Sequence, residues 1–288
     1  MKKPVRIIFP AVLFGLLLTA LYFYNNRDKS LARVQYSKRI HIGYPVGAPY
    51  AFLKSDKEVA GQSTDLAKYV ARRLGAEKIE WRQVEFSELF TELRAGRIDV
   101  VAGGPFITPE NAAFVNFSEP VFHVKQGLLV PRGNPRRLTS YKNLITTPGL
   151  RIAVIADSIE LGFLTRAGVP EEQIVAVPDA LTGRVAVEAG NADCFAVSSP
   201  AVHWMALSGQ LGKTEEAQLS EQFQLSPDER QGYGGFAFRK EDVALRDAWN
   251  EVLKEFVGSP EYNKMAAEYG FTDAELPGSM TTVEVLKR

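Results

Sequence analysis

A ten-residue pattern occurs twice in this chain of 288 residues, and it constrains the fold more than any other feature. LRAGRIDVVA at 93–102 and VEAGNADCFA at 187–196 share Ala, Gly, Asp and Ala at matching positions. In both copies a helical pattern ends at a glycine and a buried strand follows. The shift of 94 residues between the copies is too long for a solenoid unit of ~20–50 residues. The repetition therefore predicts two α/β lobes of related topology.

Short strand-like runs alternate with amphipathic helical stretches in both halves of the chain, which is typical of α/β layers. Residues 40–43 and 151–155 predict the opening strand of each lobe. Ser63 or Thr64 is expected to cap a helix that Gly75 ends in a left-handed conformation. A last helix that covers the first lobe is expected from apolar residues spaced by four: Leu245, Trp249 and Leu253.

Two further stretches, at 117–126 and 226–235, are expected to cross between the lobes. This organisation assigns residues 36–123 and 233–288 to lobe 1 and residues 124–232 to lobe 2. Two crossings make a hinge, and the cleft between hinged lobes is a common place for ligands to bind.

The N-terminus has the order of residues found in secretory signals. Basic residues at 1–6 precede an uncharged, mostly apolar run at 7–24. These 18 residues exceed the ~7–15 of a cleavable apolar region and approach the ~20 that span a bilayer. The nearest small-x-small cleavage site is at 30–32. We expect export, with residues 1–35 acting either as a cleaved signal peptide or as an inner-membrane anchor with a linker.

Charge and composition exclude several classes of function. Lys and Arg number 34, as do Asp and Glu, so bulk charge suggests no nucleic-acid partner. Residues 1–30 hold five positive charges and one negative charge, a net of +4, which leaves −4 for the remainder. Cys194 is alone and the three histidines are far apart, so no zinc motif exists. We expect no metal and no cofactor.

Motifs of common enzymes are missing as well. The chain has no G-x-S-x-G elbow, and GQLGKT at 209–214 lacks the first glycine of a phosphate loop. We therefore expect no catalytic residues and a protein that is not an enzyme.

Several stretches together carry a family resemblance over residues 36–277. They are APY at 48–50, LRAGRID at 93–99, ITPE at 107–110, NFSEP at 116–120 and FRKED at 238–242. The chain resembles the bacterial extracellular solute-binding proteins of family 3, the receptors of polar amino-acid ABC importers. Three more stretches are most similar to the ectoine and hydroxyectoine receptors of that family: AGGPFITP at 102–109, SIELG at 158–162 and YGFT at 269–272.

The resemblance implies a type II periplasmic-binding-protein fold, with two α/β lobes, two hinge crossings and a small zwitterion held between the lobes. It also implies a monomer that works outside the cytoplasm and delivers its solute to the transmembrane subunits of an ABC permease.

The family's usual contacts to an α-amino acid are missing at both ends of the ligand. Thr108 is expected to cap a helix that starts at Pro109, whose first amides would attract an anionic ligand group. Where the family usually has an arginine for the ligand carboxylate, this chain has Asn111. Where the family has an acidic residue for the ligand ammonium, this chain has Ser198.

What remains is an aromatic set with one acid. Tyr50, Phe86 and Phe106 match an aromatic cage in the ectoine-type receptors, and Glu160 matches their second-lobe carboxylate. Each ring face can contribute ~0.5–2 kcal/mol to binding a desolvated cation. The resemblance thus implies a small cationic or zwitterionic solute, an amino acid or an ectoine-like compound. The predicted ligand-binding residues are Tyr50, Phe86, Gly103, Gly104, Phe106, Asn111, Ser158, Ile159, Glu160 and Ser198.

Structural roles are the alternative for these side chains. Phe86 can act as a hydrophobic staple before a helix, and Tyr50 and Phe106 can belong to the core or its rim. Glu160 can simply complement a helix dipole, and Asn111 can be a local hydrogen-bonding group, as can Ser158.

Two other functions stay open on the same scaffold. One is an enzyme similar to the periplasmic cyclohexadienyl or arogenate dehydratases, which would need a positive anchor for its dicarboxylate substrate and an acid in the cleft. The other is a membrane-tethered sensor or adaptor, which would keep its N-terminal segment.

Overall fold

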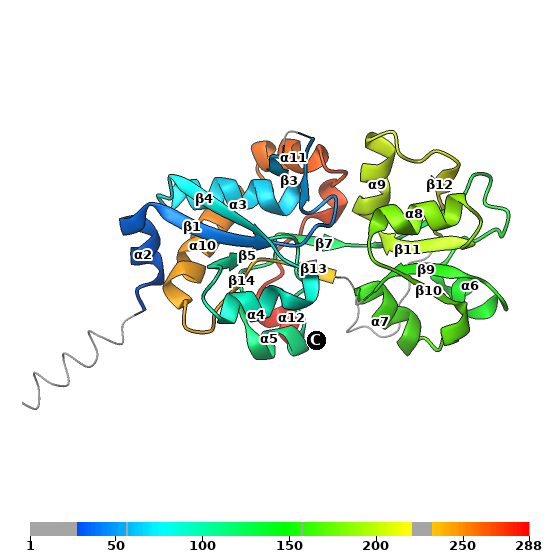
Figure 1. Cartoon of the computed structure of the whole chain (residues 1–288), viewed down its shortest axis with the longest axis horizontal. Coiled ribbons are helices and arrows are strands. Elements are labelled where there is room, and N and C mark those ends of the chain that lie inside the picture. The colour runs from blue at the N-terminus through cyan, green and yellow to red at the C-terminus, as the bar shows by residue number, and fades with distance from the viewer. Residues whose placement is uncertain (1–27, 56, 157, 221–231, 288) are drawn as a thin grey trace, which may run out of the picture.

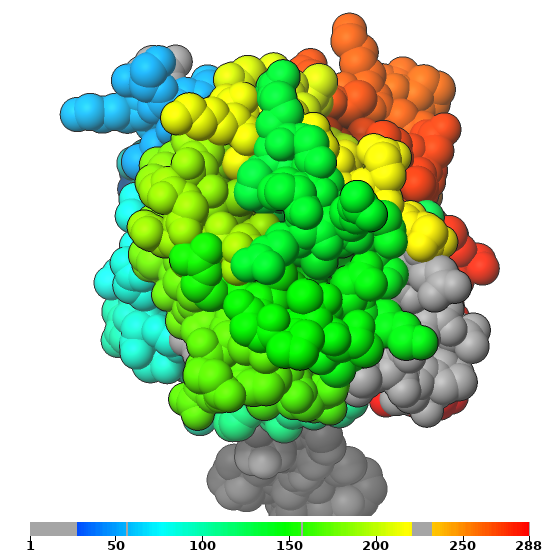
Figure 2. Space-filling model, turned by 90° about the vertical axis from the view of Figure 1, so that its right-hand side faces the viewer, coloured from blue at the N-terminus to red at the C-terminus, as the bar shows by residue number. Residues whose placement is uncertain are grey.

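The computed structural model of the chain describes residues 28–55, 57–156, 158–220 and 232–287. The predicted signal or anchor run at 7–24 lies outside these residues. Two five-stranded sheets with helices around them follow one another along the long axis of the molecule (Figure 1). Seen from one end, the second of these bodies covers most of the first (Figure 2). Here lobe 1 is the body built on the first sheet, and lobe 2 is the body built on the second.

The sheet of lobe 1 has the strand order β4-β1-β5-β14-β6. Its strands are β1 (Arg39–Tyr44), β4 (Lys78–Gln83), β5 (Val100–Val101), β6 (Asn116–Phe117) and β14 (Ala237–Phe238). β1 runs parallel to β4 and β5, and β14 pairs antiparallel with β5 and β6. A short hairpin pairs β2 (Phe52–Leu53) antiparallel with β3 (Val59–Ala60) as a separate two-stranded sheet. The helices of lobe 1 are α2 (Ser30–Ser37), α3 (Gln62–Arg73), η1 (Phe86–Glu88), α4 (Leu89–Arg94), α5 (Pro109–Phe114), α10 (Val243–Phe256), α11 (Pro260–Ala267), η4 (Asp273–Glu275) and α12 (Thr282–Leu286).

The sheet of lobe 2 has the order β10-β9-β11-β8-β12 and repeats the arrangement of lobe 1. Its strands are β8 (Gln126–Pro131), β9 (Ile152–Ile155), β10 (Ile174–Val177), β11 (Cys194–Ser198) and β12 (Thr214–Glu216). β10, β9 and β11 are parallel neighbours, whereas β8 and β12 are added antiparallel. Its helices are α6 (Tyr141–Thr146), α7 (Ile159–Arg166), η2 (Glu171–Gln173), α8 (Ala180–Glu188) and α9 (Ser199–Leu207).

The aspartate shared by the two sequence repeats has the same task in both lobes. Asp99 Oδ2 accepts a hydrogen bond from the backbone N–H of His41 at 3.0 Å, just before β5. Asp193 Oδ2 accepts one from the backbone N–H of Arg151 at 2.9 Å, just before β11. Each carboxylate therefore ties its own strand to the neighbouring parallel strand, at His41 within β1 and at Arg151 just before β9. The prediction of two related α/β lobes is confirmed.

A two-stranded ribbon runs between the lobes and forms the hinge. Its strands, β7 (Phe122–Val124) and β13 (Gly232–Gly234), pair antiparallel and lie within the two stretches predicted to cross (Figure 1). A Cβ on Gly232 would lie 2.3 Å from the Phe106 ring, and one on Gly234 would lie 2.1 Å from the Phe122 ring. Glycine is needed at both positions because these aromatic rings pack directly on the ribbon backbone.

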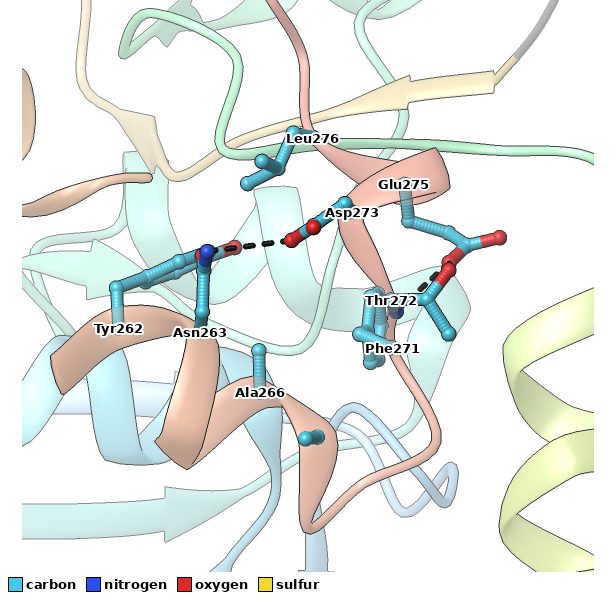
Figure 3. Close-up of a pocket in the computed structure, with 9 residues that line it drawn as sticks. Tyr262, Asn263, Ala266, Phe271, Thr272, Asp273, Glu275 and Leu276 are labelled. Atoms are coloured by element: carbon cyan, nitrogen blue, oxygen red, sulfur yellow. Dashed lines mark hydrogen bonds between the residues drawn. The ribbon is translucent and has the colours of Figure 1, made fainter. Parts of the chain in front are cut away.

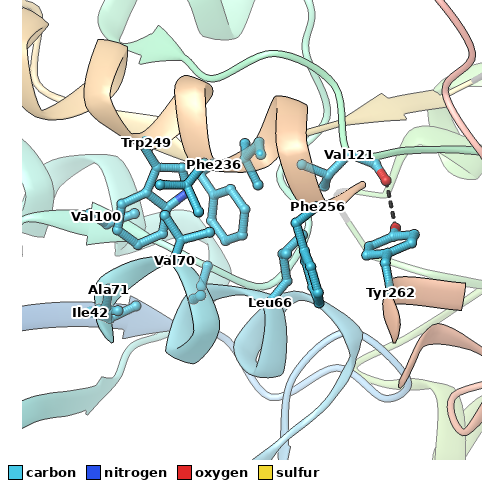
Figure 4. Packing of buried hydrophobic residues seen from close by; sticks show 14 of the residues in the cluster. Ile42, Leu66, Val70, Ala71, Val100, Val121, Phe236, Trp249, Phe256 and Tyr262 are labelled. Atoms are coloured by element: carbon cyan, nitrogen blue, oxygen red, sulfur yellow. Dashed lines mark hydrogen bonds between the residues drawn. The ribbon is translucent and has the colours of Figure 1, made fainter. Parts of the chain in front are cut away.

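The core of lobe 1 lies between the sheet and helices α3, α10 and α11. Leu66, Val70 and Trp249 are fully buried there, and the Tyr262 hydroxyl donates to the Val121 carbonyl at 2.7 Å (Figure 4). The last predicted helix is confirmed as α10, which packs against α3.

One cap prediction is wrong. α3 begins at Gln62 with Gly61 as its N-cap, ahead of Ser63 and Thr64. Gly61 has φ +133°, and a Cβ there would lie 2.3 Å from the Tyr50 carbonyl oxygen. The close approach of the two backbones selects glycine over a capping side chain. Gly75 does follow the helix in the expected left-handed conformation, at φ +94°.

Residues 30–35, expected to belong to a linker, form most of α2, and the side chain of Val34 is fully buried. Within the parts of residues 28–287 that the structure describes, the helices are too short or too polar to cross a membrane.

Candidate functional site

Tyr50 and Ser198 meet across the two lobes. The Tyr50 hydroxyl lies 3.0 Å from Ser198 Oγ, with the tyrosine in the loop after β1 and the serine at the end of β11. Ser198 is buried and also precedes the first turn of α9. Burial raises the pKa of the Tyr50 hydroxyl well above its usual value, so it is a neutral hydrogen-bonding group. The structure thus joins one predicted residue from each lobe.

An aromatic group surrounds this contact. The Tyr50 ring lies 5.3 Å from the Phe122 ring and 5.6 Å from the Phe271 ring, measured between centroids. Phe106 meets the same Phe122 ring edge-to-face at 6.4 Å. Phe122 therefore links Tyr50 with Phe106, and all these rings belong to lobe 1 or the hinge ribbon.

Phe122 and Phe271 were not predicted as site residues. Both lay in stretches already singled out, the crossing at 117–126 and the YGFT stretch at 269–272. Attention to aromatic residues within those stretches is the signal that would have found them.

Phe86 lies apart from this group. It is the first residue of η1, and 50% of its surface is exposed. In the described part of the chain, the ring contacts of Tyr50, Phe106 and Phe122 do not include it.

Gly103 and Gly104 shape the floor beneath Tyr50. Their φ angles are +124° and +77°, which side chains rarely adopt. A Cβ on Gly103 would lie 2.4 Å from Pro45 Cδ, and one on Gly104 would lie 3.0 Å from the Tyr50 ring. These glycines let the chain leaving β5 pass under the tyrosine, so they position the ring.

Glu160 supplies a buried carboxylate from lobe 2. It is the second residue of α7, after half-buried Ile159, and Ser158 caps this helix by accepting the Leu161 N–H at 3.2 Å. Burial raises the pKa of Glu160 to about 7, although hydrogen bonds from its own N–H and the Ser158 hydroxyl oppose that shift. Its negative charge also raises the pKa values of Tyr50 in lobe 1 and Tyr141 in lobe 2, so the charge of this carboxylate acts on side chains of both lobes.

The ion pairs of the described residues do not give Glu160 a lysine or arginine partner. A buried carboxylate with no cationic neighbour is costly in the ionised form, and a cation that enters its surroundings would relieve that cost.

Asn111 makes local contacts. It is the third residue of α5, and its N–H donates to the Thr108 Oγ1 at 3.1 Å, which confirms Thr108 as the cap. Its side-chain Nδ2 donates to the Phe106 carbonyl at 3.0 Å. Asn111 therefore holds the backbone of Phe106 and keeps one Nδ2 hydrogen for another acceptor.

A second contact between the lobes lies along α9, and the sequence did not reveal it. His203 Nδ1 lies 3.1 Å from the Gly270 carbonyl oxygen, and the Phe52 and Trp204 rings lie 5.3 Å apart. Gly270 has φ +81°, and a Cβ there would lie 2.7 Å from the Trp204 amide nitrogen. We call this contact between α9 and residues 269–271 the α9 seam.

A cavity of about 340 Å³ lies within lobe 1, between α11 and η4 (Figure 3). Its polar lining groups already bond one another: Asn263 Nδ2 donates to Asp273 Oδ1 at 3.2 Å, and Thr272 Oγ1 donates to Glu275 Oε2 at 2.7 Å. Of the predicted site residues none lines it, and it shares only Phe271 with the aromatic group. Because its polar groups are satisfied, this cavity suits a charged solute less well than the surroundings of Tyr50 and Glu160.

Two α/β lobes, a two-stranded hinge and converging polar and aromatic groups between the lobes define a solute-binding protein. The chain belongs to the bacterial extracellular solute-binding proteins, family 3, whose sequence profile matches residues 40–272. Membership of this family implies a location outside the cytoplasm.

Named relatives and solved structures agree with this assignment. The chain is 32% identical to a probable amino-acid ABC transporter periplasmic-binding protein of Sinorhizobium fredii over 240 residues, which cover 82% of this chain and 76% of the relative. It is 27% identical to a probable histidine-binding protein of Neisseria gonorrhoeae, over 77% of this chain and 79% of that one. Among solved structures, EhuB in complex with hydroxyectoine superposes with a TM-score of 0.77 at 26% identity, covering 90% of this chain and 98% of EhuB.

Proposed function

We propose that this protein is the solute receptor of an ABC importer and binds a small cationic or zwitterionic solute between its lobes. The solute is an amino acid or an ectoine-like compound, and the receptor delivers it as a monomer to the transmembrane permease subunits. The likeness to amino-acid receptors and to a hydroxyectoine complex supports this class of solute.

One observation carries the proposal. The buried Glu160 carboxylate of lobe 2 acts by its charge on Tyr50, which meets Ser198 across the lobes and belongs to the aromatic group of lobe 1. A cation placed there would meet a carboxylate from one lobe and ring faces from the other. Contacts to both lobes favour the closed form, which is the form that a permease can recognise.

The proposed site consists of Tyr50, Gly103, Gly104, Phe106, Asn111, Ser158, Ile159, Glu160 and Ser198. Phe86 is the remaining candidate, and it would contact the solute only if the lobes approach each other further when the solute binds. The proposed lobe boundaries are those expected from the sequence, with residues 36–123 and 233–288 in lobe 1 and 124–232 in lobe 2.

Calorimetric titration and thermal-shift screening test the proposal. The panel consists of ectoine, hydroxyectoine, betaines, polyamines and amino acids, each up to millimolar concentration. At least one cationic or zwitterionic solute is expected to bind and to raise the melting temperature. No binder at millimolar concentration would contradict the transport function.

Matched variants then locate the site. Glu160→Gln is expected to weaken binding of the cationic solute by about 30-fold or more, since truncating one partner of a buried charged pair costs ~2–5 kcal/mol. Glu172→Gln, on the exposed turn η2 of the same lobe, is the control and should bind as the unmodified chain does.

The raised pKa of Glu160 also supports a second candidate, an enzyme of the dehydratase type. A carboxylic acid with a pKa of about 7 is suited to donate a proton at neutral pH. Turnover of prephenate or arogenate that is lost in Glu160→Gln would support catalysis. Binding of a solute without turnover would support the receptor.

A further inference from the structure

Residues just after the N-terminal apolar run are built into lobe 1. Val34 of α2 is fully buried in the main core of that lobe. Arg33 donates from its guanidinium to Asp99 Oδ1 at 3.0 Å, and the same carboxylate accepts the His41 N–H of β1. α2 packs against α10 and β1.

The same segment caps helix α10. Asp28 Oδ2 accepts a hydrogen bond from the Ala244 N–H, and Ser30 Oγ accepts one from the Leu245 N–H at 3.1 Å. Asp28 Oδ1 also accepts the Ser30 N–H at 2.8 Å. Asp242, which precedes α10, makes no side-chain cap of its own. The first amides of α10 are therefore satisfied by residues from the other end of the chain. We call residues 28–37 the N-terminal clamp.

The clamp conflicts with the one available cleavage site. Between Ile7 and Ala32, the only pair of small residues spaced by two is Ser30 and Ala32. A cut after Ala32 would remove both capping residues, Asp28 and Ser30, and would divide α2. The lobe as it is folded needs the residues that such a cut removes.

From these contacts we propose that the chain keeps its apolar N-terminal run and is anchored by it to a lipid bilayer, with the clamp joining the anchor to lobe 1. The run at 7–24 holds 18 uncharged residues, close to the ~20 residues that a membrane-spanning segment needs. This inference rests on the export that the proposed function requires.

The position of the clamp sets the orientation of the anchored protein. α2 lies at the end of lobe 1 that points away from lobe 2 (Figure 1). Residues 25–29 join the apolar run to α2, and five residues span at most ~18 Å. The outer end of lobe 1 is thus held near the membrane surface, and lobe 2 with the proposed solute site lies farther from it.

Fractionation of the full chain, carrying a C-terminal tag in a Gram-negative host, tests the anchor. The protein is expected in the membrane fraction, resistant to carbonate extraction, accessible to protease in spheroplasts and with its apolar run intact by mass spectrometry. A soluble periplasmic form that begins at Arg33, or at any residue after the apolar run, would overturn the inference.

A matched variant shows whether signal peptidase can cut the chain between the apolar run and the clamp. Tyr24→Ala combined with Asn26→Ala introduces a small-x-small site ahead of the clamp. This variant is expected to be released as a soluble form that begins at Arg27, while the unmodified chain stays with the membrane. Equal release of both chains would overturn the anchor. Solute titration of the released form tests the proposed function separately, since binding there does not depend on the anchor.

The clamp itself is tested by stability. Asp28→Ala with Ser30→Ala is expected to lower the melting temperature of the full chain by about 2–4 °C, because the first amides of α10 lose their acceptors. Tyr36→Ala, at a position of α2 that is 93% exposed, is the control and should melt within about 1 °C of the unmodified chain. An unchanged melting temperature in the double variant would contradict the clamp.

Discussion

The hydroxyl of Tyr50 lies 3.0 Å from Ser198 Oγ, which joins the loop after the first strand of lobe 1 to the end of the central strand of lobe 2. This bond holds two proposed site residues together. We expect Tyr50→Phe to weaken solute binding by about fivefold, the ~1 kcal/mol of one neutral hydrogen bond. Calorimetric titration of both chains measures the effect. Unchanged affinity would show that the Tyr50–Ser198 hydrogen bond does not contribute to solute binding.

Solute affinity should depend on pH through Glu160. The pKa of this carboxyl is about 7 in the folded chain, against 4.5 for an ordinary glutamate. Between these values the folded chain keeps a proton that the unfolded chain has lost, so stability without ligand falls as the pH rises. A cationic solute needs the ionised form, so its affinity should rise about tenfold from pH 6 to pH 8.

Titrations at pH 6, 7 and 8 check this dependence, with Glu160→Gln as the comparison. The variant should bind weakly and equally at each pH. A pH dependence that survives in Glu160→Gln would assign the titration to another group.

Phe106 and Phe86 give opposite expectations. Phe106 packs on Phe122 and the hinge ribbon, so Phe106→Ala should weaken solute binding by roughly tenfold through a lost ring face and lost apolar burial. Phe86 is half exposed, so Phe86→Ala should change affinity by about twofold or less. Calorimetric titration measures the solute affinity of both variants. A large loss of affinity in Phe86→Ala would show that Phe86 belongs to the aromatic cage around the solute.

The α9 seam should govern closure of the lobes. Gly270→Ala would place a Cβ 2.7 Å from the Trp204 amide nitrogen and force α9 away from residues 269–271. We expect about tenfold weaker solute binding and a larger radius of gyration in small-angle scattering. Gly278→Ala is the control, because it has the same sign of φ, +62°, with open space around the new Cβ. Equal effects in the two variants would indicate backbone strain alone.

The repeated aspartates should differ in their contribution to stability. Asp99 pairs with Arg239, whose side chain is 7% exposed, whereas the partners of Asp193, Arg136 and Arg151, are 48% and 46% exposed. Asp99→Asn should therefore cost about 3 kcal/mol of unfolding free energy and Asp193→Asn about 1 kcal/mol. Urea denaturation measures both, and a reversed order would contradict this account of burial.

The free energy of unfolding at acidic pH should depend on the Asp99 carboxylate. Burial alone would raise the pKa of Asp99, but hydrogen bonds from the His41 amide and the Arg239 guanidinium outweigh it and lower that pKa. Its stabilising effect is therefore complete above the unfolded pKa of about 4 and is lost as the pH falls through the folded value. The stability of Asp99→Asn should change less between pH 5 and pH 3 than that of the unmodified chain.

The repeat predicted the architecture because its signals are local. A helix end, a glycine and an aspartate before a buried strand lie within ten residues, and Asp99 and Asp193 make the same bond in both lobes. The cap at Gly61 was missed because its glycine is required by the backbone of Tyr50, which is distant in sequence.

Long-range contacts explain the other differences. Phe122 and Phe271 join the aromatic group only through tertiary packing, and no spacing in the sequence marks them. Ser30 and Val34 of α2 are buried because this helix packs on α10 from the other end of the chain. Its eight residues resemble a linker when read alone.

A crystal structure of the chain with a bound cationic solute tests the central claim most directly. We expect the cationic group within about 4 Å of a Glu160 carboxylate oxygen and against the rings of Tyr50 and Phe106. A solute bound in the cavity between α11 and η4, with the surroundings of Glu160 unchanged, would contradict the account.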